Sequence, residues 1–520
     1  MSLAAPDVLP ELEALRALTA QLQAELYAKN LYIEKLKAQL ASLKRARFGR
    51  SSEKLDHLVE QLELAIADLE ESEAHAGIET TAARPIVPSP LAGATAKSSL
   101  GRKPLPAHLP SETIVHKPDC TCPTCGGSVF STIGTDEREV LEYVPSHFKR
   151  VVHLRPKLSC RACETIVQAP MPSLPIERGR PGPSLLAHVL VSKYCDHLPL
   201  HRQSDIYARE GVNLDRSTLA GWVGAMAALL QVLSDRIGTH ARAGETVHAD
   251  DTPVPVLEPG RGKTKTGRLW TVVRDERPWG SAVPPAAFYA YSPDRKGERA
   301  QHLLSPCRGF LHADAYAGFD KLYAGHPRTG EAHLIQVACW AHARRDLYNE
   351  FLRNRSPSAE RALELISDLF AVEAGINGLD PEIRLAARLA RSVPLLEILK
   401  SHLDTTLARI SGKSELAKAI RYMTSRWKAL TVYATDGRLE MSNNAAERAI
   451  RPLALGRKNY LFSGSDAGGD RAAVIYTIVE TCKMNGINPQ AYLADVIERI
   501  ADHPANRVDE LLPWNWMKRS

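Results

Sequence analysis

A series of strand-like segments begins after Gly244 and limits the folds open to this chain more than any other feature. The first three strands are predicted in the stretches ETVHADDTPVPVL, RLWTVVRDE and AAFYAYSPDR. A helical stretch near 298–304, a fourth strand in GFLHADAYAGF, a short helical piece and a fifth strand in HLIQVACWAHARRDL follow. Alternating apolar and polar residues, with turn residues between the runs, are typical of half-buried strands.

This order of strands and helices matches an RNase H-like α/β core, in which the first and fourth strands are neighbours. The tripeptide His248-Ala249-Asp250 of the first strand recurs as His312-Ala313-Asp314 in the fourth, each at the carboxyl end of an apolar run. Carboxylates that leave neighbouring strands at one level can share a divalent cation. We therefore predict that Asp250 and Asp314 lie together.

Carboxylate oxygens are the ligands that Mg²⁺ and Mn²⁺ prefer, and two such ions can promote phosphoryl transfer. A lone aspartate at a strand end is more often a turn cap, but the repeated pair favours a functional site. Asp251 points to the opposite side of its strand. We expect it to tune the site or to cap a turn at Thr252-Pro253.

A third carboxylate is predicted in the later helical stretch GRLEMSNNAAERAIRPLALGRKNYLFSGSD. Glu447 shares one helical face with Asn443 and Arg451, which are four residues before and after it. A surface ion pair between Glu447 and Arg451 is the alternative. Cations that could hold phosphate beside a metal-binding carboxylate are Arg448, Arg451, Arg457 and Lys458.

Four cysteines in two Cys-x-x-Cys pairs predict a zinc ribbon-like module. The spacing of each pair suits two thiolate ligands of a tetrahedral Zn²⁺ ion, and a redox pair is the main alternative. Cys120 and His116 are spare candidate ligands. The four predicted zinc ligands are Cys122, Cys125, Cys160 and Cys163.

Leucine and isoleucine recur in heptads near the N-terminus, which predicts coiled-coil helices. The two series contain Leu12, Leu26, Ile33 and Leu40, and Leu15, Leu22, Leu36 and Leu43. A helical hairpin closing on itself and a dimerisation zipper are both compatible with the pattern. A stretch rich in Pro, Ala, Gly and Ser after this region is typical of a flexible linker.

The region 180–240 is predicted to be helical and resembles a helix-turn-helix. An amphipathic helix in HRQSDIYARE precedes a turn at 211–214, and Asp215 or Ser217 can cap the next helix. Any helical hairpin with a glycine turn has this outline, so the pattern leaves DNA contact open.

Composition narrows the class of protein. The 520 residues are 44% hydrophobic and 24% charged, as in globular chains of several domains, and the net charge of +6 permits a polyanionic partner without requiring one. The N-terminus lacks a signal-peptide pattern, and no apolar run is expected to reach the roughly 18 residues of a membrane span. We therefore expect a cytoplasmic protein whose cysteines are reduced or bind metal.

Long stretches of the chain resemble the large transposase subunit of the insertion-sequence sixty-six family, a family of DDE transposases. The matching stretches include CPTCGG with CRAC, KYCDHLPLHRQ, HADDTPVPVL, CWAHARRDL and NNAAERAIRPLALGRKNYLFSGSD. The resemblance implies that Asp250, Asp314 and Glu447 form the DDE triad. It also implies double-stranded DNA as substrate, a homodimer or larger oligomer, and small accessory proteins encoded by the same element in a bacterial cell.

The expected fold class is multidomain α+β. The predicted parts are coiled-coil helices at 1–76, a linker at 77–112, a zinc-finger-like module at 113–175, a helical DNA-binding-like region at 180–240, an RNase H-like DDE domain at 241–465 with an all-helical insertion at about 347–438, and a short helical C-terminal domain at 466–520. The leading hypothesis is a transposase that binds terminal inverted repeats and then cleaves and transfers strands. The alternatives are a zinc-containing DNA-binding repressor or scaffold with a decayed nuclease core, and a nuclease without strand transfer.

Overall fold

The computed structural model describes residues 148, 157–159, 166–168, 173–176, 181–258, 260, 263–314, 316–324, 334–460 and 462–516. The predicted coiled coil, the linker and the four candidate zinc ligands lie outside these residues. Two short antiparallel strands, β1 (Lys157–Ser159) and β2 (Ile166–Gln168), flank the second cysteine pair in the sequence, with Ser159 opposite Ile166.

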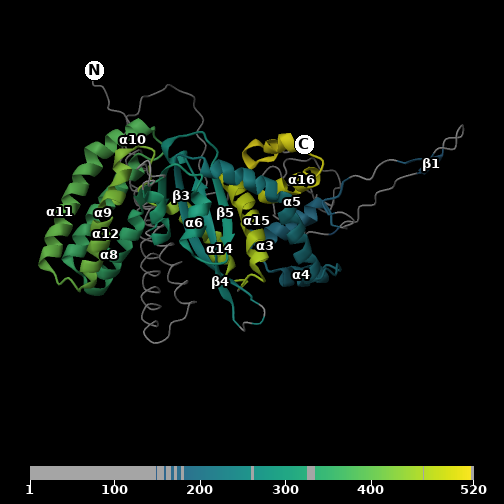
Figure 1. Ribbon diagram of the computed structural model, residues 1–520, viewed down its shortest axis with the longest axis horizontal. Helices are drawn as coiled ribbons and strands as arrows, with labels where there is room; N and C mark the ends of the chain where they lie inside the picture. Colours follow the sequence, from purple (N-terminus) through teal and green to yellow (C-terminus); the bar gives the residue numbers. More distant parts are fainter. Residues whose placement is uncertain are drawn as a thin grey trace, which may run out of the picture. The chain divides into compact units, whose positions relative to one another are not determined.

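A mixed sheet of five strands lies in the centre of Figure 1, in the order β5-β4-β3-β6-β7. Its strands are β3 (Thr246–Val256), β4 (Lys265–Arg274), β5 (Ala286–Ser292), β6 (Gly309–Ala313) and β7 (Leu334–Ala338). β4 pairs antiparallel with β3 and β5, whereas β6 pairs parallel with β3 and β7. The predicted adjacency of the first and fourth strands of this sheet is confirmed.

The two faces of β3 carry different side chains because successive residues alternate across a strand. Val247 and Ala249 belong to an apolar cluster with Leu311 and with residues of α6 (Gly297–Leu304), η2 (Ala317–Phe319) and α7 (Asp320–Tyr323). His248 and Asp250 belong to the opposite face of the strand. This second face meets α14 (Asn444–Gly456), and it carries the predicted site.

Helix α15 (Asp466–Met484) closes the sheet edge formed by β5. The Thr477 hydroxyl accepts a 2.9 Å hydrogen bond from the backbone N–H of Tyr289, and the Thr481 hydroxyl lies 3.2 Å from both the backbone N and O of Ala287. Backbone groups that an edge strand normally leaves open are therefore occupied by side chains of a helix.

Within the described residues, three helices precede the sheet: α3 (Pro183–Tyr194), α4 (Leu200–Arg209) and α5 (Arg216–Arg242). The predicted turn is present between α4 and α5, where Gly211 has a φ of 82°, and Asp215 is the N-cap residue of α5. The chain ends in α16 (Pro489–Arg499), which packs on α3, and in the 3-10 turns η5 (Ala505–Leu511) and η6 (Pro513–Asn515).

Helix α5 corrects one sequence expectation. It is long and apolar enough to cross a membrane, with a mean hydropathy of 1.4 over its most apolar 18 residues. It packs on α15, β5 and β4, and Met226, Leu230 and Ile237 are fully buried. These contacts bury one side of the helix against the folded domain.

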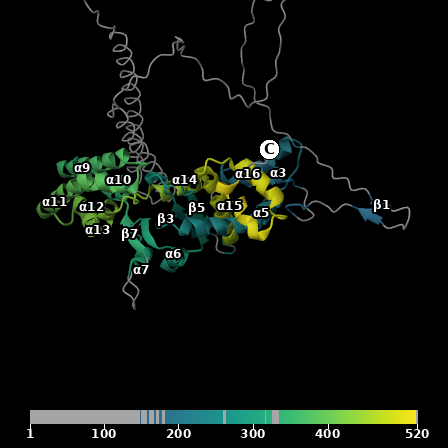
Figure 2. The ribbon, with the colours of Figure 1, turned by 90° about the horizontal axis from the view of Figure 1, so that it is seen from above.

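The regular elements described between β7 and α14, where the sequence analysis expected an all-helical insertion, are helices, and Figure 2 shows several of them grouped beyond β7. A buried cluster joins most of these helices to Val337 and Ala338 of β7. The helices described between β7 and α14 are α8 (Trp340–Asn354), α9 (Pro357–Gly375), α10 (Pro381–Ala387), the π-turn η3 (Arg388–Ser392), α11 (Val393–Arg409), α12 (Glu415–Ser425), α13 (Trp427–Thr431) and the 3-10 turn η4 (Val432–Thr435). One further 3-10 turn, η1 (Arg277–Trp279), lies between β4 and β5.

Two buried arginines hold the segment that leads from this insertion to α14. Arg388 donates two hydrogen bonds to the Glu373 carboxylate, at 2.8 and 2.6 Å, and others to three backbone carbonyls between 433 and 439. Arg384 donates to the carbonyls of Gly437 and Leu439 and to Glu440. Charged side chains are rarely this buried unless they are paired. The segment before α14 is therefore fixed by specific polar contacts.

Candidate active site

Strand register brings the two aspartates of the repeated tripeptide to one level. His248 of β3 lies opposite His312 of β6 in the parallel ladder, so Asp250 and Asp314 each follow two residues later. Both therefore have the parity of the sheet face that meets α14. The sequence pattern predicted that Asp250 lies at the end of its strand, but β3 continues to Val256. What ends near Asp250 is the pairing of β3 with β6.

Glu447 reaches this face from the first turn of α14. Asn443, the N-cap residue, is buried, and its side-chain amide donates a 3.0 Å hydrogen bond to the carbonyl of Ala249, next to Asp250. Glu447 is 7% exposed, so a plain surface ion pair with Arg451 does not describe its surroundings. The asparagine fixes the start of the helix against β3 and with it the position of the glutamate.

The charges of the neighbouring acids act on Asp250. Burial raises the pKa of Asp250 well above its usual value, and the negative charges of Asp314, Glu447 and Asp251 raise it further. A hydrogen bond from the backbone N–H of Asp251, at 2.8 Å, opposes this effect. Like charges gathered in a buried place are unfavourable unless a cation neutralises them. The donor set fits a hard divalent cation with oxygen ligands.

The histidines of the repeated tripeptides form a contact that the sequence reasoning missed. Their rings stack with centroids 4.2 Å apart, and His248 Nδ1 donates to the Asn443 side-chain oxygen at 3.2 Å. Burial lowers the pKa of His248 to about 4 and that of His312 well below its usual value. Both rings are therefore neutral near pH 7, and they link β3, β6 and the start of α14. The repeat of the tripeptide was the sequence signal from which this contact could have been predicted.

Asp251 has a different role from the predicted turn cap. Thr252 and Pro253 belong to β3, so no turn forms there. The Asp251 carboxylate instead lies 3.1 Å from Arg268 and 2.8 Å from Arg295 in ion pairs, and its side chain is 2% exposed. Arg295 also lies 3.9 Å from Asp314. Asp251 therefore anchors the arginine beside the site.

We expect Asp251→Asn to lower stability and to keep activity. The amide preserves the shape of the side chain but loses the charge that two arginines share, which costs about 1–3 kcal/mol. Chemical denaturation and metal-dependent DNA cleavage measure the two effects. The matched control is Asp404→Asn, whose exposed pair with Lys400 is worth only about 0.5 kcal/mol. Loss of all cleavage in a folded Asp251→Asn protein would contradict this role.

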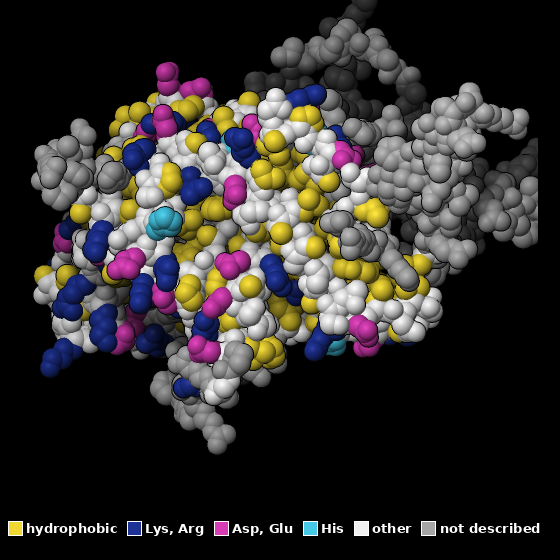
Figure 3. Space-filling model, turned by 45° about the vertical axis from the view of Figure 1, so that its right-hand side comes forward, with side chains coloured by type: hydrophobic (Ala, Val, Ile, Leu, Met, Phe, Trp, Pro, Cys, Tyr) yellow, Lys and Arg dark blue, Asp and Glu magenta, His cyan; other side chains and the backbone are white. Residues whose placement is uncertain are grey.

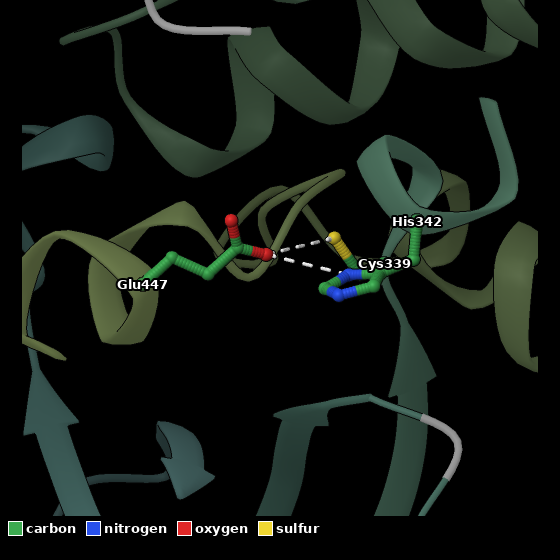
Figure 4. Close-up of side chains that lie close together, drawn as sticks. All are labelled: Cys339, His342 and Glu447. Atoms are coloured by element: carbon green, nitrogen blue, oxygen red, sulfur yellow. Dashed lines mark hydrogen bonds and ion pairs between the residues drawn. The ribbon is translucent and has the colours of Figure 1, made fainter. Parts of the chain in front are cut away.

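A second group of side chains that can bind a metal contacts Glu447, and the sequence reasoning did not predict it (Figure 4). Cys339, the N-cap residue of α8, and His342 in the first turn of that helix face Oε1 of Glu447. His342 Nδ1 lies 3.3 Å from this oxygen and Cys339 Sγ lies 3.9 Å from it. The spacing Cys-x-x-His in CWAH was the available signal.

The predicted phosphate-binding cations lie on or after α14 with different exposures. Arg448 and Lys458 are exposed, whereas Arg451 and Arg457 are half-buried. Arg457 donates a hydrogen bond to the carbonyl of Pro253 in β3. On the face drawn in Figure 3, lysines and arginines are interspersed with acidic and hydrophobic side chains.

Four family models match the amino-acid sequence. The model described as "Transposase IS66 family" matches residues 178–471, which include all three acids of the site, and "IS66 C-terminal element" matches 477–514. "Transposase C of IS166 homeodomain" matches 35–114 and "zinc-finger binding domain of transposase IS66" matches 119–164. The last range contains Cys122, Cys125, Cys160 and Cys163.

Similar proteins occur in Sinorhizobium fredii. The uncharacterized protein y4hP is 41% identical over 505 residues, which cover 95% of this chain and 89% of that protein. The uncharacterized protein y4qI is 37% identical over 509 residues, covering 97% and 93% of the two chains. The similarity therefore extends over nearly the whole length of both relatives.

Proposed function

Because this chain belongs to the IS66 family of transposases, we propose that it cleaves and joins DNA at the ends of its element through Asp250, Asp314 and Glu447. One observation carries the proposal: the register of β3 and β6 sets Asp250 and Asp314 at one level, and Asn443 holds the start of the Glu447 helix against Ala249, beside Asp250. The pKa of Asp250, which is raised by burial and by the charges of Asp314 and Glu447, agrees with this arrangement. Three carboxylates so gathered can hold two Mg²⁺ or Mn²⁺ ions.

Such ions, when bound, supply Lewis-acid activation of an attacking oxygen and stabilisation of a leaving oxygen. The protein supplies the positions of the ligands. Asn443 holds the start of α14 against β3, and the stacked pair of His248 and His312 keeps the two strands in register. The neutral rings add no positive charge that would compete for the carboxylates.

DNA binding is expected to use cationic side chains near the acids. Arg448, Arg451 and Lys458 are candidates for phosphate contacts, and Arg457 is a candidate that also contacts β3. Terminal inverted repeats are the proposed specific substrate and the helix-turn-helix-like pair α4 and α5 is a candidate reader. A homodimer or larger oligomer and small accessory proteins of the element belong to the same proposal.

The experiment that tests this function is a strand-cleavage assay on DNA that carries the ends of the element. We expect cleavage with Mg²⁺ or Mn²⁺, none with chelator, and joined products when target DNA is present. Cut ends without joined products would identify a nuclease without strand transfer. Binding to the ends without cleavage under any metal condition would identify the repressor or scaffold instead.

The match to a zinc-finger model supports a structural zinc ion held by Cys122, Cys125, Cys160 and Cys163. We expect replacement of Cys122 and Cys160 by serine to remove one zinc ion per chain and to weaken DNA binding, because structural zinc contributes folding free energy directly. Elemental analysis of the purified protein measures the first effect and a binding titration the second. Unchanged zinc content would exclude these ligands.

A further inference from the structure

We infer that Cys339, His342 and Glu447 form a second metal site, selective for a soft divalent ion of the zinc class, whose occupation takes Glu447 from the carboxylate triad. The three ligand atoms come from the N-terminus of α8 and the first turn of α14 and lie within 4.8 Å of one another. This combination of sulfur, nitrogen and oxygen suits Zn²⁺, whereas Mg²⁺ avoids thiolate. The site is different from the predicted zinc ribbon.

The distances agree with a tetrahedral zinc ion. Zinc bonds of about 2.0–2.3 Å at tetrahedral angles place two ligand atoms roughly 3.3–3.6 Å apart. The measured separations are 3.3 Å from His342 Nδ1 to Glu447 Oε1 and 3.9 Å from Cys339 Sγ to the same oxygen. Small movements of the side chains would therefore complete the geometry. Three protein ligands leave a fourth position for water.

The surroundings of Cys339 suit a thiolate that is bound to metal. Its sulfur accepts a 3.2 Å hydrogen bond from the backbone N–H of Asn443 and others from the backbone N–H groups of Ala341 and His342, at the start of α8. Donors of this kind stabilise metal-bound sulfur. Zinc binds cysteine as the thiolate, so binding replaces the S–H proton, which is released to water.

The position of Glu447 gives the site a consequence for the reaction. Its charge acts on Asp250, and its Oε1 faces Cys339 and His342. A zinc ion held by this oxygen draws the charge away from Asp250 and Asp314. Zinc is therefore expected to inhibit magnesium-dependent cleavage. This inhibition rests on the proposed function, whereas the binding of zinc to the three side chains does not.

The first test counts bound zinc in the full-length protein. A chromophoric chelator competes for Zn²⁺ with the wild type, Cys339→Ser, His342→Gln and the control Cys307→Ser, whose thiol is buried in the apolar cluster beneath β3. We expect the wild type and Cys307→Ser to bind one more zinc ion per chain than either site variant. Cobalt should give a thiolate charge-transfer band that Cys339→Ser weakens. Equal zinc content and affinity in all four proteins would overturn the site.

The second test measures zinc inhibition of cleavage at fixed Mg²⁺, each protein being compared with its own zinc-free rate. The zinc concentration for half inhibition should be about 100-fold higher for Cys339→Ser than for the wild type, because a first ligand is lost. Equal inhibition of both would refute the link to Glu447. A wild type that never cleaves would contradict the proposed function, while the zinc titration would still decide the site. His342→Gln, at a partly exposed position, repeats both tests if Cys339→Ser does not fold.

Discussion

Asp250→Asn is expected to reduce metal-dependent DNA cleavage by at least roughly 1000-fold. The amide keeps the size of the side chain but removes a charged metal ligand, and the loss of several kcal/mol of transition-state stabilisation corresponds to such a factor. Asp314→Asn and Glu447→Gln should have effects of the same order. Binding to DNA that carries the element ends should remain, because the phosphate-binding cations are unchanged.

Asp251→Asn is the matched control, since the two aspartates are adjacent and only Asp250 belongs to the proposed triad, whereas Asp251 pairs with Arg295. Stability gives a readout independent of activity. Folding raises the pKa of Asp250, so its ionised form costs stability in the metal-free protein once the pH exceeds the unfolded value near 3.9. Asp250→Asn should therefore melt higher than the wild type without metal and gain less from Mg²⁺. Wild-type cleavage by this variant would remove Asp250 from the triad.

Arg388→Met is expected to destabilise the protein by about 3–5 kcal/mol, because it removes both hydrogen bonds to the largely buried Glu373 carboxylate and those to the carbonyls of Tyr433 and Asp436. The carbonyl of Leu439 keeps the hydrogen bond from Arg384. The midpoint of chemical denaturation measures the loss. Cleavage should fall as well, since the released segment from 433 to 440 leads directly to the helix of Glu447.

An exposed arginine of the same insertion serves as control for this experiment. Arg361 pairs with Glu364 on α9 with both side chains more than half exposed, so Arg361→Met should change stability by less than about 1 kcal/mol. Replacing Arg388 and Glu373 together by apolar residues should recover part of the loss, because no unpaired buried charge remains. Equal effects of Arg388→Met and Arg361→Met would show that the buried network is not needed.

The sheet could be predicted from sequence because its strands alternate strongly. All five were located, and their order together with the repeated tripeptide was enough to place Asp250 beside Asp314. Membership of the transposase family, implied by the long motifs, is confirmed by the family models. The zinc ligands and the heptads lie outside the described residues and stay predictions.

The predicted turn at Thr252-Pro253 was wrong for a reason of sheet topology. Pairing of β3 with β6 stops at His248, so the later part of β3 has no β6 neighbour to receive N–H donors. Prolines, which lack a donor, are tolerated at such an open side, and the carbonyl of Pro255 accepts from Ser463 there instead. The length of the neighbouring strand β6 cannot be predicted from the local sequence of β3.

The contacts among buried polar side chains were not predicted from the sequence either. Arg384 and Arg388 were not singled out from the sequence, because arginine is seldom buried and the backbone carbonyls that they bind between 433 and 439 lie 45 to 55 residues later in the chain. Cys339 and His342 had a recognisable spacing, but their third partner lies more than 100 residues away. Periodicity indicates which face is buried; it does not identify long-range polar partners.

The threonines of α15 have a consequence for assembly. An open edge strand can recruit a strand from another molecule and so join two sheets into one. Thr477 and Thr481 already occupy the N–H of Tyr289 and both backbone groups of Ala287, so this part of β5 offers no template for a foreign strand. Several copies meeting on one DNA molecule would therefore not join by adding a strand to β5 at these two residues.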